Sequence, residues 1–276
     1  PNGDRKVSDY DQAALRGALS TFYLSQRDGD YATANEGLTV VQYWNDEPDE
    51  QVASLIKNTR QKSEALDFRH VLFNEQEARN FLNDRFGPRS LSAFDKSFHQ
   101  AQKSDIFRYH YLLAEGGVWI DADMTICGDL TKISKKGACA FSYKNKSTGR
   151  LSNRMIWSPP GVELMKFIVN CVLENMEDES LLQKCKEERD ILSLSGPKIV
   201  NYSFMEFFED PNAPSLSRLN LFLVDEVLFS SVFVSAKNFL GEELHYKKTN
   251  RSWQNWASEV PGSPISLHLE KIKFFD

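Results

Sequence analysis

Residues 104–124 read SDIFRYHYLLAEGGVWIDADM, and the spacing of apolar residues changes halfway through this stretch. The first half has apolar side chains at helical spacing, with Ser104 as the expected N-cap and a pair of glycines where the helix should end. The second half is typical of a buried strand. Because residues two apart in a strand point to the same side, Asp121 and Asp123 are expected on one face, with their carboxylates close together. Such a pair repels itself unless a cation or hydrogen-bond donors compensate it.

The segments around this stretch alternate between strand patterns and helix patterns. Short β-branched and aromatic runs predict strands, and longer runs with apolar residues three or four apart predict helices. This alternation is typical of a parallel sheet with helical crossovers, so the expected fold class is α/β. The predicted strands cover 38–44, 68–73, 138–143 and one or two segments of 221–234, and the predicted helices cover 8–23, 49–61, 74–84, 161–176, 176–190 and 196–210.

Length and composition limit the class of protein. The 276 residues, of which 41% are hydrophobic, can bury one substantial core. No run reaches the roughly 18 apolar residues of a membrane span, so we expect a soluble protein, and peripheral contact at the inner face of a membrane is left open. The formal net charge of −6 argues against a general nucleic-acid binder, and oligomeric state is left open. The widely spaced cysteines are expected to be buried thiols rather than disulfides, which favours a reducing compartment and a cytoplasmic location; they are Cys127, Cys139, Cys171 and Cys185.

The candidate chemistry depends on the two aspartates, because other catalytic patterns are absent from the sequence. The five histidines show no H-E-x-x-H spacing, and there is no phosphate-binding G-x-x-x-x-G-K-[ST] or acyl-transfer G-x-S-x-G motif. A D-x-D at the end of a buried strand suits Mg²⁺ or Mn²⁺, which take oxygen ligands and leave positions for substrate phosphates, although the bare pattern also occurs by chance. Asp105 and Arg108 share a helix face, either as a surface ion pair or as groups that hold a sugar and its diphosphate.

The whole of residues 104–124 closely resembles the signature S-D-x-x-R-[YF]-x-x-L-x-x-x-G-G-x-[YW]-x-D-x-D of DXD-containing glycosyltransferases with the GT-A fold. This family includes yeast initiating α-1,6-mannosyltransferase and bacterial capsule and lipopolysaccharide enzymes, with clostridial glucosylating toxins as more distant relatives. Weaker similarities extend over VVQYWNDEPDE, LSNRMIWSPPG, LSGPKIVN and HYKKTNRSW, although the first has Val-Val-Gln-Tyr where the family usually has a His-Gln pair. The resemblance implies a Rossmann-like, mostly parallel sheet flanked by helices, with an N-terminal helical extension at 1–37 and a GT-A domain at 38–276 that ends in a closing loop.

The resemblance also implies roles for individual residues. Asp123 would be the direct metal ligand, and Asp121 would contact ribose and donor sugar and complete the metal site. Asp105 and Arg108 would hold donor hydroxyls, with Arg108 also near the diphosphate. Asn153 would face the anomeric carbon unless it is an ordinary turn residue. The other implied site residues are Trp44 (beside the nucleobase, or else in the core), Tyr43, Ser104, Gly196, Pro197 and Trp253 for the donor, Ser252 for donor and metal, Asn250 for the metal, and His245 as a metal-side group or an exposed loop residue.

The activity implied by this resemblance is metal-dependent transfer of a hexose or N-acetylhexosamine, with Mn²⁺ or Mg²⁺ as cofactor and a UDP-sugar or GDP-sugar as donor. Such relatives mostly retain the anomeric configuration, and the expected acceptor is a glycan of a polysaccharide or lipopolysaccharide. Front-face attack is favoured, because no residue presents itself as the carboxylate nucleophile of a double displacement. Three alternatives stay open: a toxin-type enzyme that glycosylates protein, a catalytically silent sugar-nucleotide-binding module, and a phosphoryl or nucleotidyl transferase.

Overall fold

The computed structural model describes five segments of the chain, which are 38–134, 139–144, 150–209, 221–249 and 252–259. The helix predicted at 8–23, the whole 1–37 extension and Asn250 lie outside these residues, so those predictions stay untested. Within the described segments, the predicted elements up to residue 209 are present, and most of their boundaries agree with the structure to within a few residues.

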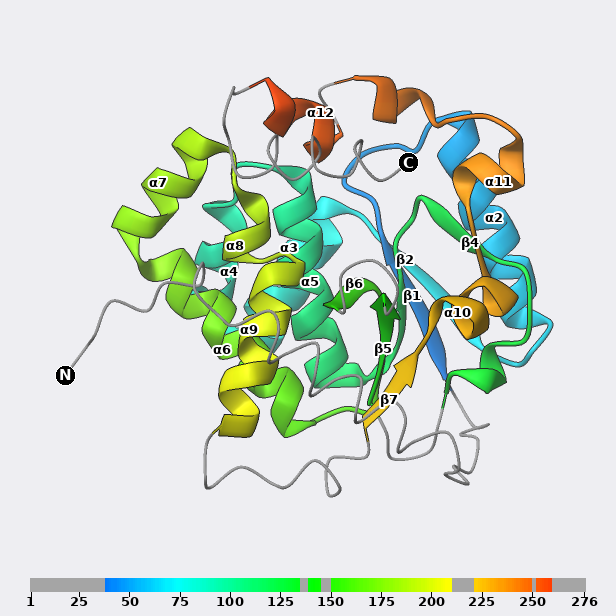
Figure 1. Cartoon of the computed structure of the whole chain (residues 1–276), viewed down its shortest axis with the longest axis horizontal. Coiled ribbons are helices and arrows are strands. Elements are labelled where there is room, and N and C mark those ends of the chain that lie inside the picture. The colour runs from blue at the N-terminus through cyan, green and yellow to red at the C-terminus, as the bar shows by residue number, and fades with distance from the viewer. Residues whose placement is uncertain (1–37, 135–138, 145–149, 210–220, 250–251, 260–276) are drawn as a thin grey trace.

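A six-stranded sheet forms the centre of the fold (Figure 1). Its strands are β1 (Thr39–Tyr43), β2 (Arg69–Phe73), β3 (Gly117–Ile120), β5 (Cys139–Lys144), β6 (Arg150–Ser158) and β7 (Leu221–Val224). They lie in the order β2-β1-β3-β6-β5-β7, and β6 runs antiparallel to both of its neighbours while the other described pairs are parallel. The predicted α/β class with a mostly parallel central sheet is therefore confirmed.

Helices lie on both sides of this sheet (Figure 1). One side carries α3 (Glu75–Phe86), α4 (Pro88–Asp95), α5 (Gln100–Glu115), α6 (Glu163–Glu177), α7 (Glu179–Glu188), α8 (Ile191–Leu194) and α9 (Pro197–Glu209). The other side carries α2 (Glu50–Glu64), α10 (Glu226–Val232), α11 (Ala236–Leu240), the 3-10 turn η2 (Leu130–Lys132) and a small sheet of β4 (Met124–Ile126) and β8 (Phe233–Ser235). The last described elements are η4 (His245–Lys248) and α12 (Trp253–Ser258).

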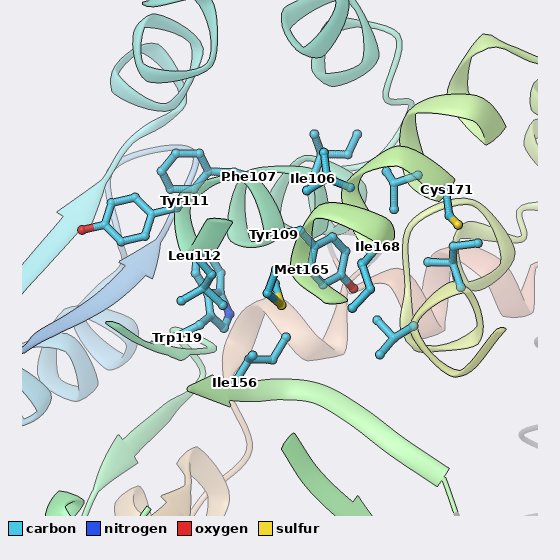
Figure 2. Packing of buried hydrophobic residues seen from close by; sticks show 14 of the residues in the cluster. Ile106, Phe107, Tyr109, Tyr111, Leu112, Trp119, Ile156, Met165, Ile168 and Cys171 are labelled. Carbon is cyan, nitrogen blue, oxygen red and sulfur yellow. The ribbon is translucent and has the colours of Figure 1, made fainter. Parts of the chain in front are cut away.

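Strand β3 divides its side chains between the two sides of the sheet. Val118 and Ile120 pack in the core on the α10 side, whereas Trp119 points to the α5 side (Figure 2). Trp119 is fully buried, with its ring centroid 6.2 Å from that of Phe107 on α5. Because side chains alternate along an extended chain, Asp121 also faces α5.

A bulge interrupts the pairing of β6 with β5. Phe141 pairs with Ile156, but the next residue of β5, Ser142, pairs with Ser152. Residues 153–155 therefore have no partners on β5. Such extra residues bend a strand and redirect side chains, and they occur often beside active sites.

The bulge breaks the alternation of side chains along β6. Asn153 points to α5, while Arg154 points to the opposite side, where its Nη2 lies 3.0 Å from the Glu226 carboxylate and its guanidinium 3.7 Å from the Phe229 ring centroid. Met155 also packs on that opposite side, in the core with α10. The bulge thus changes which side of the sheet the neighbouring residues of β6 face.

Helix α5 begins earlier than predicted. Its N-cap is His99, whose imidazole Nδ1 accepts a hydrogen bond from the backbone N–H of Ala101 at 3.0 Å. Ser104 lies inside the helix, so the prediction that it is the N-cap is wrong. Histidine is not among the side chains preferred at this position, which is why the sequence favoured the serine.

Strand β3 ends at Ile120, and both aspartates lie in the turn that follows. The backbone N–H of Met124 donates to the carbonyl of Asp121 at 3.0 Å, and this bond reverses the chain into β4. The prediction that Asp121 and Asp123 share a strand face is therefore wrong. The helix before β3 does end at the predicted glycines, and a Cβ on Gly117 would lie 2.5 Å from the carbonyl oxygen of Thr39.

Segment 221–234 holds two strands, as one of the predictions allowed, with the unpredicted helix α10 between them. Cys139, Cys171 and Cys185 are buried free thiols as expected, whereas Cys127 is exposed, which corrects its predicted burial. Among the residues that the structure describes, no helix combines the length and apolarity needed to cross a bilayer.

Candidate active site

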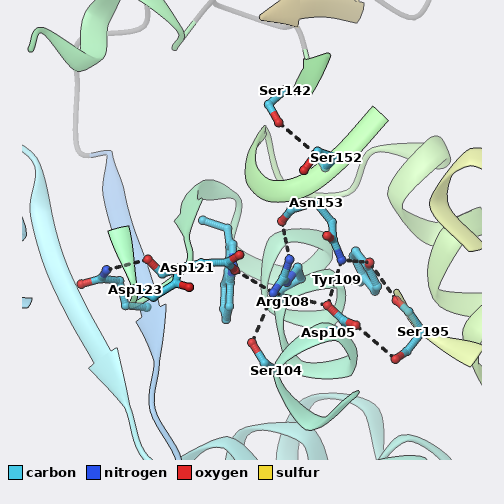
Figure 3. A network of polar contacts seen from close by, with 12 residues as sticks. Ser104, Asp105, Arg108, Tyr109, Asp121, Asp123, Ser142, Ser152, Asn153 and Ser195 are labelled. Carbon is cyan, nitrogen blue, oxygen red and sulfur yellow. Dashed lines mark hydrogen bonds and ion pairs between the residues drawn. The ribbon is translucent and has the colours of Figure 1, made fainter. Parts of the chain in front are cut away.

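Asp121 follows β3 directly and is held against α5. Its Oδ1 accepts hydrogen bonds from Arg108 Nη2 at 2.8 Å and from Trp119 Nε1 at 3.0 Å (Figure 3). Its backbone N–H extends the sheet by donating to the carbonyl of Arg154 at 3.0 Å. Burial raises the pKa of the Asp121 carboxyl, and the Arg108 guanidinium opposes that shift. One oxygen of Asp121 is thus fixed by the protein.

Arg108 lies at the centre of a buried polar network (Figure 3). Asp105 is 6% exposed and Arg108 is 4% exposed, and Arg108 Nη2 lies 3.3 Å from Asp105 Oδ1. Arg108 Nη1 donates to the carbonyl of Asn153 in the bulge, and its guanidinium lies 4.8 Å from the Trp119 ring centroid. The alternative of a surface ion pair is wrong, because both groups are buried and Arg108 also binds Asp121.

Asp105 accepts hydrogen bonds on both carboxylate oxygens. Asn153 Nδ2 donates to Oδ1 at 2.8 Å, and the hydroxyl of Ser195 donates to Oδ2 at 3.2 Å. Burial raises the pKa of the Asp105 carboxyl to about 7, although Arg108 and the two hydrogen bonds act in the opposite direction. The network therefore joins α5, β6 and the segment before α9 around one buried carboxyl group.

Tyr109 and Ser195 belong to this network and were missed by sequence reasoning. Tyr109 Oη donates to the carbonyl of Ser195 at 2.9 Å and accepts from Asn153 Nδ2 at 2.9 Å. Ser195 directly precedes the predicted donor residues Gly196 and Pro197, so the LSGPKIVN match was the available signal for it. A Cβ on Gly196 would lie 2.8 Å from the backbone of α8, which explains why glycine stands there. The prediction that Asn153 could be a turn residue is wrong, since it lies in β6 and is buried.

Asp123 is bound by the C-terminal part of the described chain. Its Oδ2 lies 2.6 Å from Lys247 Nζ and accepts a hydrogen bond from Tyr246 Oη at 3.2 Å. The backbone carbonyl of Asp123 accepts from the N–H of Ala236 at 3.1 Å. The two aspartates of the D-x-D therefore contact different cations, Arg108 for one and Lys247 for the other. Tyr246 and Lys247 were not among the predicted site residues, although both stand in the HYKKTNRSW match.

Two aromatic residues predicted for the donor site, Tyr43 at the end of β1 and Trp44 directly after it, have different surroundings. Trp44 meets the ring of Tyr246 edge to face, with centroids 5.2 Å apart, and packs with Ala122 and Leu244. Trp44 thus lies beside the segment that binds Asp123. Tyr43 is buried in the main core, with its ring 5.8 Å from that of Phe107, so it belongs to the packing between β1 and α5.

The predicted C-terminal site residues are not gathered at the aspartates. Ser252 is buried at the start of α12, where its N–H donates to the carbonyl of Thr249 at 3.1 Å, and Trp253 packs beside Ile191. His245 is exposed, and its backbone N–H donates to Gln51. No side-chain hydrogen bond or ion pair from Ser252, Trp253 or His245 to either aspartate occurs in the described segments. Their assigned roles stay predictions.

The predicted metal ligands Asp121 and Asp123 are not joined by a third acidic, histidine or cysteine ligand among the described residues. Across the segments that the structure describes, no three His, Cys, Asp or Glu side chains come together as a ligand cluster. Asp121 Oδ2 and Asp123 Oδ1 make no hydrogen bond to the described residues, and both are hard oxygen donors. Mg²⁺ and similar cations are commonly held by one or two carboxylates together with water and substrate phosphates. Asp121 and Asp123 fit that arrangement.

Comparison with known proteins connects this geometry to a family. The family model described as "Glycosyltransferase sugar-binding region containing DXD motif" matches residues 46–139. An uncharacterized glycosyltransferase of Acanthamoeba polyphaga mimivirus is 26% identical over 155 residues, which are 55% of this chain and 58% of that protein. This chain therefore spans little more than half the length of that relative.

Two solved structures are similar over most of this chain. The PaToxG glycosyltransferase has a TM-score of 0.48 at 15% identity, and the match covers 92% of this chain and 99% of that one. The UDP-bound glycosyltransferase domain of the YGT toxin has a TM-score of 0.37 at 12% identity, and the match covers 74% and 66%. Structural matches with TM-scores this low add no evidence on chemistry. The family match, in contrast, spans both aspartates and the Asp105–Arg108 pair. Residues 46–139 thus match the model of the DXD-containing sugar-binding region of glycosyltransferases.

Proposed function

We propose that this chain is a glycosyltransferase that takes its sugar from a nucleoside diphosphate donor. The observation that carries the proposal is the position of the D-x-D: it lies in the family-matched region, at the carboxyl end of β3, beside a buried network that fixes one of its carboxylates. In open α/β sheets, ligands bind outside the carboxyl ends of the strands. A solvated, randomly occurring D-x-D would not be held by buried groups from α5 and β3.

Asp121 and Asp123 are the proposed metal-binding groups, because each has a carboxylate oxygen without a partner among the described residues. A bound Mn²⁺ or Mg²⁺ would stabilise the negative charge of a departing diphosphate. Arg108 holds Asp121 in place. Asp105, with both oxygens bonded, holds Arg108 and Asn153 and is thereby proposed to shape the pocket for donor hydroxyls.

The transfer is proposed to retain the anomeric configuration by front-face attack of an acceptor hydroxyl. Support comes from the family resemblance and from the bonding of the site carboxylates, since Asp105 and Asp121 are both paired with Arg108. A carboxylate held in this way is a poor nucleophile for a double displacement. Proton NMR of the product of a UDP-hexose or GDP-hexose reaction decides the point, and a β-linked product from an α-linked donor would contradict retention.

The proposed acceptor is a glycan hydroxyl, of the kind found in polysaccharides or lipopolysaccharides. A protein side chain is the second candidate, which the resemblance to toxin enzymes supports. Parallel assays with a panel of oligosaccharides and with a protein extract, each supplied with a radiolabelled donor, separate the two acceptors. Label found only in protein would contradict the glycan proposal while leaving the transferase proposal intact.

The first test of the proposed function is calorimetry of UDP and GDP binding, with and without Mn²⁺. We expect one nucleotide to bind in a metal-dependent manner, and we expect Asp123→Ala to abolish this binding. Asp84→Ala is the matched control, because it removes an exposed carboxylate from α3, away from the site. If neither nucleotide binds the folded chain under any metal condition, the proposed function is wrong.

A further inference from the structure

Among the described residues of the C-terminal part, Lys247 is the cation that contacts the D-x-D. Its ammonium lies 2.6 Å from Asp123 Oδ2, and the Tyr246 hydroxyl binds the same oxygen at 3.2 Å. The carboxylate of Asp123, which is proposed as a metal ligand, therefore already has a positive partner within the chain.

The backbone that carries Lys247 is anchored to α2 and to α12. Leu244 is buried against α2, and the N–H of His245 donates to Gln51 Oε1 on that helix at 2.7 Å. Asn255 of α12 donates its Nδ2 to the carbonyl of Lys247 at 2.6 Å. These contacts fix the backbone of Lys247 at a place from which its side chain reaches Asp123.

The side chain of Lys247 keeps more freedom than its backbone. It is 34% exposed, and the Asp123 side chain is 22% exposed. An ammonium on a four-carbon stem is a flexible point charge, unlike the planar guanidinium of Arg108, which is clamped by several acceptors. Lys247 can therefore leave Asp123 without disturbing the fold, whereas Arg108 cannot leave Asp121.

Charge balance gives a reason for Lys247 to move. The site holds Asp105, Asp121 and Asp123 against Arg108 and Lys247, so its groups compensate one another almost completely without a ligand. A divalent cation at the aspartates would repel the ammonium, and the diphosphate of a donor would attract it. Both forces act in the same direction, from Asp123 toward the phosphates.

We propose that Lys247 occupies the cation position at Asp123 in the ligand-free chain, yields it to a divalent cation, and then binds the diphosphate of the donor. The second half rests on the proposed function, and the first half does not. Lys247 would then be a residue on which donor affinity depends, as well as a competitor of the metal.

The first half is tested with Mn²⁺ alone on the full chain, followed by electron paramagnetic resonance. Because the ion pair that the metal must displace is lost, Lys247→Met should bind Mn²⁺ roughly fivefold more tightly than the unaltered chain. Lys248→Met is the matched control, since it removes the same charge from the exposed neighbouring residue and should leave Mn²⁺ affinity nearly unchanged. Equal affinities in the two variants, or no Mn²⁺ binding to Lys247→Met, would overturn this half.

The second half is tested by calorimetry at saturating Mn²⁺, with UDP or GDP, whichever the unaltered chain binds. Lys247→Met should then bind the nucleotide roughly tenfold more weakly than Lys248→Met, because a charge-assisted contact is lost. Unchanged affinity would overturn the diphosphate role. If neither nucleotide binds the unaltered chain, the proposed function and this second half fail together, and the Mn²⁺ comparison alone decides the first half. Thermal melts of both variants verify that each is folded.

Discussion

The two aspartates of the D-x-D are both partly exposed, but the cations that hold them differ in burial, since the side chain of Arg108 is 5% exposed and that of Lys247 is 34% exposed. Asp121 belongs to a buried network whose members come from α5, β3 and β6, and Arg108 at its centre is 4% exposed. Asp123 is bound by Tyr246 and Lys247 from a late 3-10 turn, in a partly exposed pair. The contrast teaches that one carboxylate is a fixed part of the fold, while the other is open to exchange of its partner.

The largest effect that tests this comparison is loss of Arg108. Arg108→Ala leaves Asp105 buried without a counter-charge and removes the contact to Asp121, so we expect the free energy of unfolding to fall by about 3–5 kcal/mol. Urea denaturation measures it. Arg79→Ala is the matched control: its pair with Asp95 joins side chains that are 35% and 37% exposed, so the loss should stay within about 1 kcal/mol. Equal losses in both variants would contradict a special role for the buried network.

A smaller effect concerns the pH dependence of stability. Burial raises the pKa of Asp105 to about 7 from an ordinary value of 3.8, so the folded chain binds a proton that the unfolded chain releases. Its contribution to stability is present at low pH and is lost as pH rises through the folded-state pKa, by up to about 1.4 kcal/mol per pH unit. Urea denaturation of the unaltered chain and of Asp105→Asn between pH 5 and 8 measures this slope. Identical slopes in both chains would show that Asp105 is ionised throughout.

The smallest effect is expected for the pair of Asp123 with Lys247. Lys247→Met removes a partly exposed ion pair, so the free energy of unfolding should change by less than about 1 kcal/mol. The same urea experiment measures it beside Arg108→Ala. A loss as large as that of the arginine variant would mean that the Asp123–Lys247 pair contributes as much to stability as the network around Arg108.

Local patterns in the sequence predicted the class of fold and most of its elements. The spacing of apolar residues predicted β1, α2, β2 and α3 correctly, because each of these elements buries one face. Start signals such as the capping box at Asn74 also helped. The start of α5 was misplaced because a histidine caps it. The end of β3 was misplaced because a turn closed by a backbone hydrogen bond leaves no residue-type signal.

The sequence predicted the residues of the candidate site that lie in matched motifs, but not those brought in by a distant part of the chain. Asp105, Arg108 and Asp121 were found through the family signature and Asn153 through the weaker similarity of LSNRMIWSPPG, and the structure joins them in one network. Lys247 escaped notice, because contact with Asp123 depends on how the chain returns after α11. Sequence spacing does not encode a separation of 124 residues, whereas it does encode neighbours on a helix.

The bulge at residues 153–155 makes the length of β6 as important as its composition. A substitution there removes one contact, but deletion of a single residue would rotate the remaining bulge residues by half a turn of the strand. The carboxamide of Asn153 would then leave Asp105, and the guanidinium of Arg154 would enter the space beside the buried Arg108. Two like charges would then meet away from water, so electrostatic repulsion disfavours a change in the length of this strand. Among related chains, a difference in length at this point would therefore signal a differently built site even where the D-x-D itself is intact.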